Sequence, residues 1–213
     1  INFAVEAPAM GYKAKNLALG PCFFTAKPEF IKIREQNIQN FNKDIHNILI
    51  FFSGMMDLSF VGKEILTILE QSFEKITVNY ISKYFTPNQL EKLFLSKNQY
   101  YVIDPTCSIE NYFSEADFVI AGGGLIKYES AFCCIPSAVL SFDLEQLIEA
   151  QNFSAENLGY DLGLYDKLTL EELGKNLIYY LKESSLRKNI YHSTRETFHS
   201  NSGERLAEYI LKI

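Results

Sequence analysis

Five short apolar runs, each followed by a stretch of helical periodicity, constrain the fold of this chain more than any other feature. The runs occupy residues 47–52, 76–81, 99–103, 117–121 and 137–142. The stretches with apolar residues three and four positions apart occupy residues 61–72, 87–95, 108–115, 125–134 and 144–153. Buried strands that alternate with amphipathic helices indicate βαβ units with right-handed crossovers. The sequence therefore predicts an α/β fold with a Rossmann-like, doubly wound parallel sheet.

The N-terminal region lacks this pattern. Residues 1–45 show no strong period and contain several glycines and prolines. We expect them to form a leader that packs onto a domain made by residues 46–213. The chain begins with Ile1 rather than methionine, and we expect it to be a piece of a longer protein.

The C-terminal region is predicted to be mostly helical, over residues 169–183 and again from Ser185 onward. Thr169 is followed three residues later by Glu172. This spacing is the capping box that begins many helices.

The composition excludes several classes of function. Of the 213 residues, 47% are hydrophobic and 22% charged, with a net charge of −6, so the chain resembles an ordinary globular protein without a strongly basic face. Nucleic acid is therefore not an expected partner. No apolar run approaches the roughly 20 residues of a membrane span, and no signal peptide is recognisable. The four cysteines fit no zinc motif, and we expect a cytoplasmic protein with reduced thiols.

The most informative segment is the glycine run Gly122, Gly123 and Gly124, which lies between a predicted buried strand and a predicted helix. Glycines allow a tight turn and a close approach of the backbone to a ligand. The free N–H groups of the following helical turn favour an anion such as phosphate. Glu129 lies roughly 6–8 Å further along the helix axis, where a carboxylate can accept hydrogen bonds from ribose hydroxyls. The segment therefore predicts a nucleotide site.

Two neighbouring side chains have two candidate roles each. Lys127 is a candidate for the phosphate or for a solvated surface position, and Ser130 is a candidate ribose contact or a packing residue. A second candidate turn, with Ser53 and Gly54, follows the first predicted strand, where ligands of open α/β sheets bind. The alternative there is an ordinary βα turn, with Asp57 close to a helix start.

No metal site and no cofactor are expected. The histidines are His46, His192 and His199; the last two are seven residues apart and lack an evident third ligand. We interpret them as solvated or capping residues.

At this point the sequence resembles a known family, the UDP-sugar hydrolases of pseudaminic acid biosynthesis, which are similar to glycosyltransferases of GT-B fold such as the MurG type. Residues 19–30 (LGPCFFTAKPEF) resemble the family's leader, and residues 53–57 fall where the family has a GGSD-like turn. Residues 114–131, closed by the dipeptide at 135–136, are similar to the signature ADLVIxxGGxxxxEAxxxGxP. Residues 201–205 resemble a glycine-rich turn before the last helix.

The resemblance implies that this chain is the second of two Rossmann-like domains, the C-terminal domain of a GT-B fold. It implies that Glu129 binds the uridine ribose and that Gly122–Gly124 approach the diphosphate. Glu145 and Gln146 stand nearest to the family's Asn-Gln pair, which implies contact with the sugar. The activating histidine of the family belongs to the preceding domain, so the protein's own N-terminal domain is an expected partner.

Three functions remain open at this stage. The first is a UDP-sugar hydrolase, in which water attacks the anomeric carbon and UDP leaves. The second is the donor-binding domain of a GT-B glycosyltransferase. The third is a non-catalytic nucleotide-sugar-binding module, suggested by three departures from the family pattern, which are Met55, Phe60 and Glu145.

Overall fold

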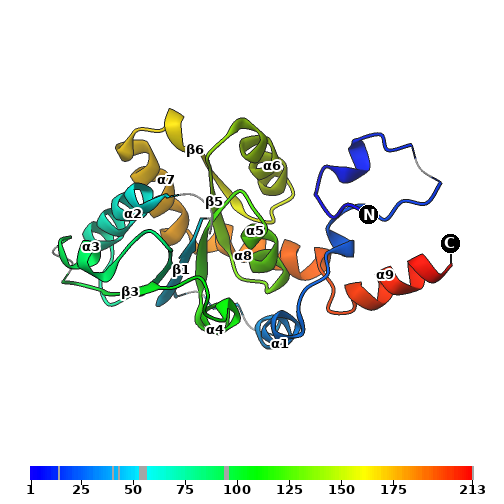
Figure 1. Ribbon diagram of the computed structural model, residues 1–213, viewed down its shortest axis with the longest axis horizontal. Coiled ribbons are helices and arrows are strands. Elements are labelled where there is room, and N and C mark those ends of the chain that lie inside the picture. Colours follow the sequence, from blue (N-terminus) through cyan, green and yellow to red (C-terminus); the bar gives the residue numbers. More distant parts are fainter. Residues whose placement is uncertain (14, 40, 43, 53–56, 94–95, 213) are drawn as a thin grey trace.

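The computed structural model describes residues 1–13, 15–39, 41–42, 44–52, 57–93 and 96–212. Its centre is a six-stranded sheet in the order β3-β2-β1-β4-β5-β6, in which every described pair of neighbours is parallel (Figure 1). The strands are β1 (Asn47–Phe51), β2 (Thr77–Ile81), β3 (Gln99–Ile103), β4 (Phe118–Gly122), β5 (Ser137–Ser141) and β6 (Tyr160–Leu164). This order is that of a Rossmann fold, so the predicted fold class is confirmed.

Helices cover both faces of the sheet, because the strand residues alternate between two apolar cores. Ile48 and Ile50 of β1 face one core and Leu49 faces the other. The first core includes side chains of α2 (Ser59–Ser72), α3 (Pro87–Glu91) and α7 (Leu170–Lys182), and the second includes side chains of α1 (Pro28–Asn37), α4 (Ile109–Glu115), α5 (Ile126–Phe132) and α6 (Leu144–Ala155). Helix α8 (Ser184–Thr197) contacts both α7 and α5.

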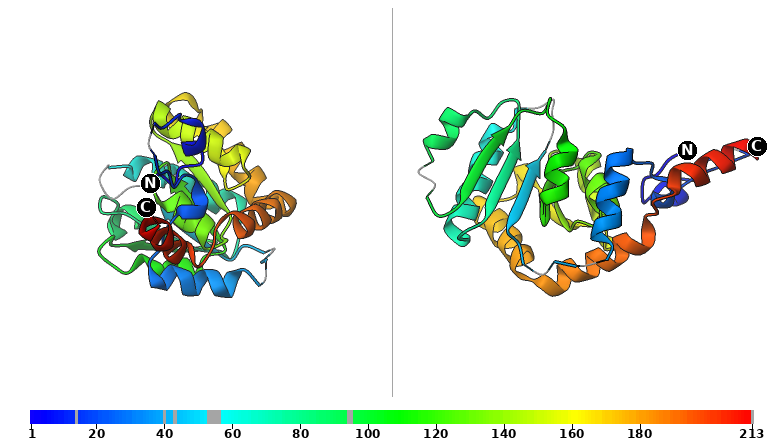
Figure 2. Two further views of the ribbon diagram at one scale, coloured as in Figure 1. Left: turned by 90° about the vertical axis from the view of Figure 1, so that its right-hand side faces the viewer. Right: turned by 90° about the horizontal axis from the view of Figure 1, so that it is seen from below.

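The N-terminal segment and the C-terminal helix lie side by side. Figures 1 and 2 show residues 1–13 and 15–20 and α9 (Ser202–Leu211) projecting together from the body of the domain. The Tyr209 hydroxyl donates a hydrogen bond of 2.7 Å to the carbonyl of Leu17, and the Ser202 hydroxyl donates to the carbonyl of Phe24. The described residues also form three short 3-10 turns: Ala7–Ala9, Pro21–Phe23 and Tyr165–Lys167.

The structure confirms the five predicted strands and adds elements that periodicity did not reveal. Strand β6 was missed because Asp161 and Gly163 have low strand propensity, and Gly163 has a φ of +103° beside a register shift in the pairing with β5. Helix α1 was missed within the leader, although Pro28 occupies its first turn, where proline is favoured. The capping box of Thr169 and Glu172 is confirmed at the start of α7.

Several element boundaries also differ from the prediction. Helix α3 ends at Glu91, before the predicted limit at residue 95. The glycine-rich turn expected at residues 201–205 is the first turn of α9, which begins directly after Asn201.

In the part of the chain that is described, every helix is too short or too polar to cross a membrane.

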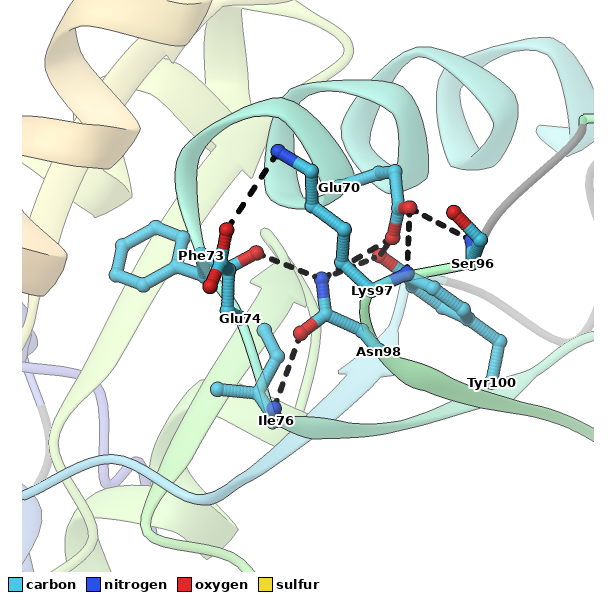
Figure 3. Close-up of polar contacts among 8 residues, drawn as sticks. All are labelled: Glu70, Phe73, Glu74, Ile76, Ser96, Lys97, Asn98 and Tyr100. Atoms are coloured by element: carbon cyan, nitrogen blue, oxygen red, sulfur yellow. Dashed lines mark hydrogen bonds and ion pairs between the residues drawn. The ribbon is translucent and has the colours of Figure 1, made fainter.

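At the end of the sheet where the strands begin, Glu70 of α2 binds the start of β3 and the residues before it (Figure 3). One carboxylate oxygen accepts hydrogen bonds from the backbone amides of Ser96 and Lys97 at 2.7 and 2.8 Å. The other accepts from the Asn98 side chain and the Tyr100 hydroxyl, both at 3.1 Å. Burial raises the pKa of Glu70, but these four hydrogen bonds outweigh it, and the pKa lies below its usual value.

Replacing Glu70 by alanine is expected to lower the free energy of unfolding by about 2 kcal/mol at pH 7, because four donors lose a charged acceptor that is partly exposed to water. Since the folded-state pKa is depressed, this stabilisation is present above the ordinary glutamate pKa and is lost as the pH falls through the folded value. Urea unfolding of wild type and Glu70→Ala at pH 7 and near pH 3 measures both effects. The matched control is Glu74→Ala, which removes an exposed carboxylate 3.8 Å from Lys97. An equal loss in both variants would contradict the assignment.

Candidate functional site

The candidate site lies where the strand order reverses, at the carboxyl ends of β1 and β4. These strands are neighbours, whereas the chain proceeds from β1 outward to β2 and from β4 outward to β5. Gly122 ends β4 against the backbone of Phe52, and a Cβ at Gly122 would lie 2.4 Å from the Phe52 carbonyl oxygen. Only glycine permits this approach. Open α/β sheets bind ligands at such a switch point.

The next two glycines form a bend between β4 and α5. A Cβ at Gly123 would lie 2.6 Å from the side chain of Gln146, whereas a Cβ at Gly124 would meet nothing within 4 Å. Gly123 is buried and Gly124 is exposed. In the described part of the chain, the N–H groups of Gly124 and Leu125 donate to no acceptor. The bend therefore presents free amide donors on an open surface.

Helix α5 is buried on all sides except along one stripe. Leu125, Ile126 and Glu129 are exposed or half-buried, while the other residues of the helix are buried. Residues three and four apart share one side of a helix, so Glu129 lies on the same side as the start of the helix at Leu125. The amides of the bend and the carboxylate are thus arranged along one open stripe.

The carboxylate of Glu129 is available to a ligand. Among the residues that the structure describes, no side chain or amide forms a hydrogen bond with it. Burial raises its pKa, the nearby Lys27 ammonium opposes this rise, and the Glu110 carboxylate adds to it. Lys27 is itself paired with Glu110 at 2.7 Å. Glu129 is therefore a half-buried acceptor beside an ion pair between the leader and α4.

Lys27 and Glu110 were not singled out in the sequence. Each lies in a segment whose pattern indicates only a leader or the first turn of a helix, and 83 positions separate them. Their proximity to Glu129 arises from the packing of the N-terminal segment on α5. Phe3 and Phe24 contact the ring of Tyr128, with centroid separations of 5.2 and 6.0 Å.

Lys127 and Ser130 point into the protein. The Lys127 side chain has no exposed surface; its ammonium donates to the Gly123 carbonyl and pairs with Glu149 of α6 at 2.8 Å. The alternative of a solvated surface lysine is therefore wrong. The Ser130 hydroxyl is buried and donates to the Ile135 carbonyl at 2.8 Å, which is the packing role. Contact of either side chain with a nucleotide stays a prediction.

The other predicted residues lie around the same bend or outside the described chain. Ser53 and Gly54 belong to residues 53–56, which are outside the described residues. Glu145 is exposed in the first turn of α6. The Gln146 amide accepts a hydrogen bond from the Phe142 N–H at 3.1 Å and donates to the Asp143 carboxylate at 2.8 Å. Gln146 therefore supports the bend at Gly123 from α6.

The departure at Phe60 is now located. Its side chain is 51% exposed in the first turn of α2, and its ring packs edge-on against that of Tyr165 at 5.5 Å. The described residues contain no group of three or more histidine, cysteine or acidic side chains placed to hold a metal ion.

Comparison with solved structures identifies the fold. MurG of Acinetobacter baumannii superimposes with a TM-score of 0.66 at 17% identity, over 89% of this chain and 58% of that chain. The chain has the fold of a GT-B C-terminal domain. A putative UDP-N-acetylglucosamine 2-epimerase from Listeria monocytogenes superimposes on this chain with a TM-score of 0.57 at 15% identity, over 88% of this chain and 48% of that chain.

At the level of sequence, the chain is similar to the spore coat polysaccharide biosynthesis protein SpsG of Bacillus subtilis (strain 168). The two are 25% identical over 180 residues, which are 83% of this chain and 52% of that protein. No family model matches the chain. The chain spans about half the length of the relatives that it matches.

Proposed function

We propose that this chain is the nucleotide-sugar-binding half of a UDP-sugar hydrolase in the biosynthesis of a surface polysaccharide or a pseudaminic-like acid. One observation carries the proposal: the Gly124 and Leu125 amides of the open bend and the Glu129 carboxylate, all without a hydrogen-bond partner among the described residues, lie along one stripe of α5. The similarity to a polysaccharide biosynthesis protein and to GT-B structures supports it.

The spacing suits a nucleoside diphosphate. Backbone amides at the start of a helix favour a phosphate. The attraction is stronger beside the buried end of β4, because the local dielectric constant is lower there than in water. Glu129 is five residues beyond Gly124, a rise of roughly 7 Å, which is close to the separation of a diphosphate and the ribose hydroxyls of the same nucleotide. In this arrangement the bend holds the diphosphate, Glu129 accepts from the ribose, and Glu145 and Gln146 lie toward the sugar.

The chemistry proposed is cleavage of the anomeric C–O bond. Water adds to the anomeric carbon, the bond to the β-phosphate oxygen breaks, and UDP leaves with the electron pair. The bend stabilises the charge that develops on the departing diphosphate. The general base comes from the protein's own N-terminal domain in this proposal, and residues 1–45 are the leader that joins it to the present domain.

A second candidate is the donor half of a glycosyltransferase, in which a hydroxyl acceptor replaces water. The similarity to MurG and to a glycosyltransferase VinC solved in complex with dTDP favours it; the latter has a TM-score of 0.56 and 12% identity. Binding of the nucleotide would be the same in both reactions. Only the acceptor differs.

Product analysis with the protein that carries both halves distinguishes these candidates. We expect UDP and a free reducing sugar to appear in equal amounts from a UDP-sugar without an added acceptor. UDP released only with an acceptor, and without a reducing sugar, would replace the hydrolase by the transferase. UDP binding by calorimetry without any turnover would leave a non-catalytic module, and no binding of UDP or dTDP would overturn the proposal.

A further inference from the structure

Lys127 is the one charged residue among the largest fully buried side chains that the structure describes. Its ammonium contacts two groups from different elements. It donates to the backbone carbonyl of Gly123, in the bend, and pairs with Glu149 of α6 at 2.8 Å. A buried charge is costly unless it is paired and hydrogen-bonded. An apolar side chain would fill this space at lower cost, so we expect a further role of the ammonium.

The geometry of the peptide supplies a reason. In a planar trans peptide the C=O and the N–H of the next residue point in opposite directions. The carbonyl of Gly123 and the N–H of Gly124 belong to one such peptide. Because the buried ammonium of Lys127 holds the carbonyl inward, the N–H of Gly124 must point outward. Outward is the open side, since Gly124 is exposed and a Cβ there would contact nothing.

The bend needs such a device because glycines do not hold a conformation by themselves. Gly123 and Gly124 have no side chains, and glycine is the residue with the widest choice of backbone angles. Without a contact that selects one orientation, the peptide between them can turn over and present its carbonyl to the open side. A carbonyl oxygen facing a diphosphate would repel it.

We infer that Lys127 is a positioning residue: from inside the protein it fixes the Gly123–Gly124 peptide so that the Gly124 N–H faces the anion. In this role Lys127 acts through the peptide, which is an alternative to the direct phosphate contact that the sequence predicts. The Glu149 carboxylate keeps the ammonium in place from α6, the helix whose Gln146 also packs on Gly123. The inference rests on the proposed function for the identity of the anion, a nucleoside diphosphate, but the order of the bend itself does not depend on a ligand.

Two variants separate this role from that of the ion pair. Lys127→Met keeps most of the side-chain volume and removes the donor to Gly123. Glu149→Gln removes the ion pair but leaves a carbonyl oxygen that can accept from the ammonium. The control Thr194→Val removes another buried hydrogen bond, from the Thr194 hydroxyl to the Tyr191 carbonyl at 3.0 Å in α8. Amide ¹⁵N order parameters of the ligand-free chain and UDP titration are measured for all four proteins.

We expect Lys127→Met to lower the order parameters of Gly123 and Gly124 below about 0.6, the flexible range, and to weaken UDP binding on the order of tenfold. Glu149→Gln should bind UDP within about twofold of wild type, although it melts at a lower temperature. Thr194→Val should leave both readouts unchanged. An ordered bend in Lys127→Met, or equal losses of affinity in Lys127→Met and Glu149→Gln, would overturn the inference. If wild type binds no UDP, the proposed function fails, while the order parameters still decide the role of Lys127.

Discussion

Glu129→Ala is expected to weaken UDP binding by about 1–3 kcal/mol, or about 5- to 150-fold, because the ribose hydroxyls lose a charged acceptor. The carboxylate is half-buried and unpartnered among the described residues, so its removal leaves no protein donor without an acceptor. Calorimetric titration of wild type and variant with UDP measures the change. Glu171→Ala, on α7, is the control and should bind UDP as wild type does.

The nucleotide itself offers a second control. If Glu129 accepts from the ribose, 2′-deoxy-UDP should bind wild type more weakly than UDP does, and Glu129→Ala should no longer distinguish the two ligands. Additive losses from the protein change and the ligand change would contradict the contact. Unchanged UDP affinity in Glu129→Ala would reject the assignment altogether.

The same residue predicts a pH dependence. Burial raises the pKa of Glu129, so as the pH falls the carboxylate is protonated before an ordinary glutamate would be, and UDP affinity declines. The UDP affinity of Glu129→Gln, measured at each pH, should lack this decline. Because the phosphates of UDP titrate in the same way with both proteins, the variant also corrects for that titration. The pH affects folding stability in the opposite direction. Because the pKa of Glu129 is raised in the folded state, the charged carboxylate destabilises the fold at pH values above that pKa. Glu129→Gln should therefore melt no lower than wild type at pH 7, which separates lost binding from unfolding.

Arg34→Met is expected to cost about 3 kcal/mol or more of the free energy of unfolding, the largest loss that we predict for the fold. Arg34 of α1 is buried, and its guanidinium joins the carboxyl ends of two helices to the leader. It donates to the Phe132 carbonyl at 2.6 Å, to the Arg195 carbonyl at 2.9 Å and to the Phe198 carbonyl. Methionine would fill part of the space but remove the guanidinium donor from all three carbonyls.

Urea unfolding and melting curves check this prediction. For a chain of this length, 3 kcal/mol corresponds to a fall of roughly 6–12 °C in the melting temperature. The control is Arg195→Met, because the Arg195 side chain is exposed and only its backbone carbonyl takes part in the cluster. Similar melting temperatures for the two variants would show that α1 is held by its apolar contacts alone.

The sequence by itself determined the architecture. Apolar runs that alternate with amphipathic helices allow few arrangements other than a parallel sheet covered on both faces, and the strands that bury both faces were the easiest to recognise. The edge strand β6 was not predicted. An edge strand tolerates Asp161 and Gly163, and these two residues interrupt the apolar pattern by which a strand is recognised. The glycine run and Glu129 were also legible, since a turn and the acid beyond it lie within ten residues of each other.

Only the tertiary structure decided which partners the polar side chains meet. In the sequence Lys127 is a candidate either for the phosphate or for a solvated surface position, yet it is buried and contacts the Gly123 carbonyl and Glu149. Arg34 reads as a polar position of an irregular leader, yet it joins three segments up to 164 positions apart. The physical reason is that periodicity reports which side of an element faces the core, whereas a hydrogen bond depends on atoms from other elements within about 3 Å. The bend could be read from the sequence, whereas the contacts of Lys127 with the Gly123 carbonyl and Glu149 beneath it could not.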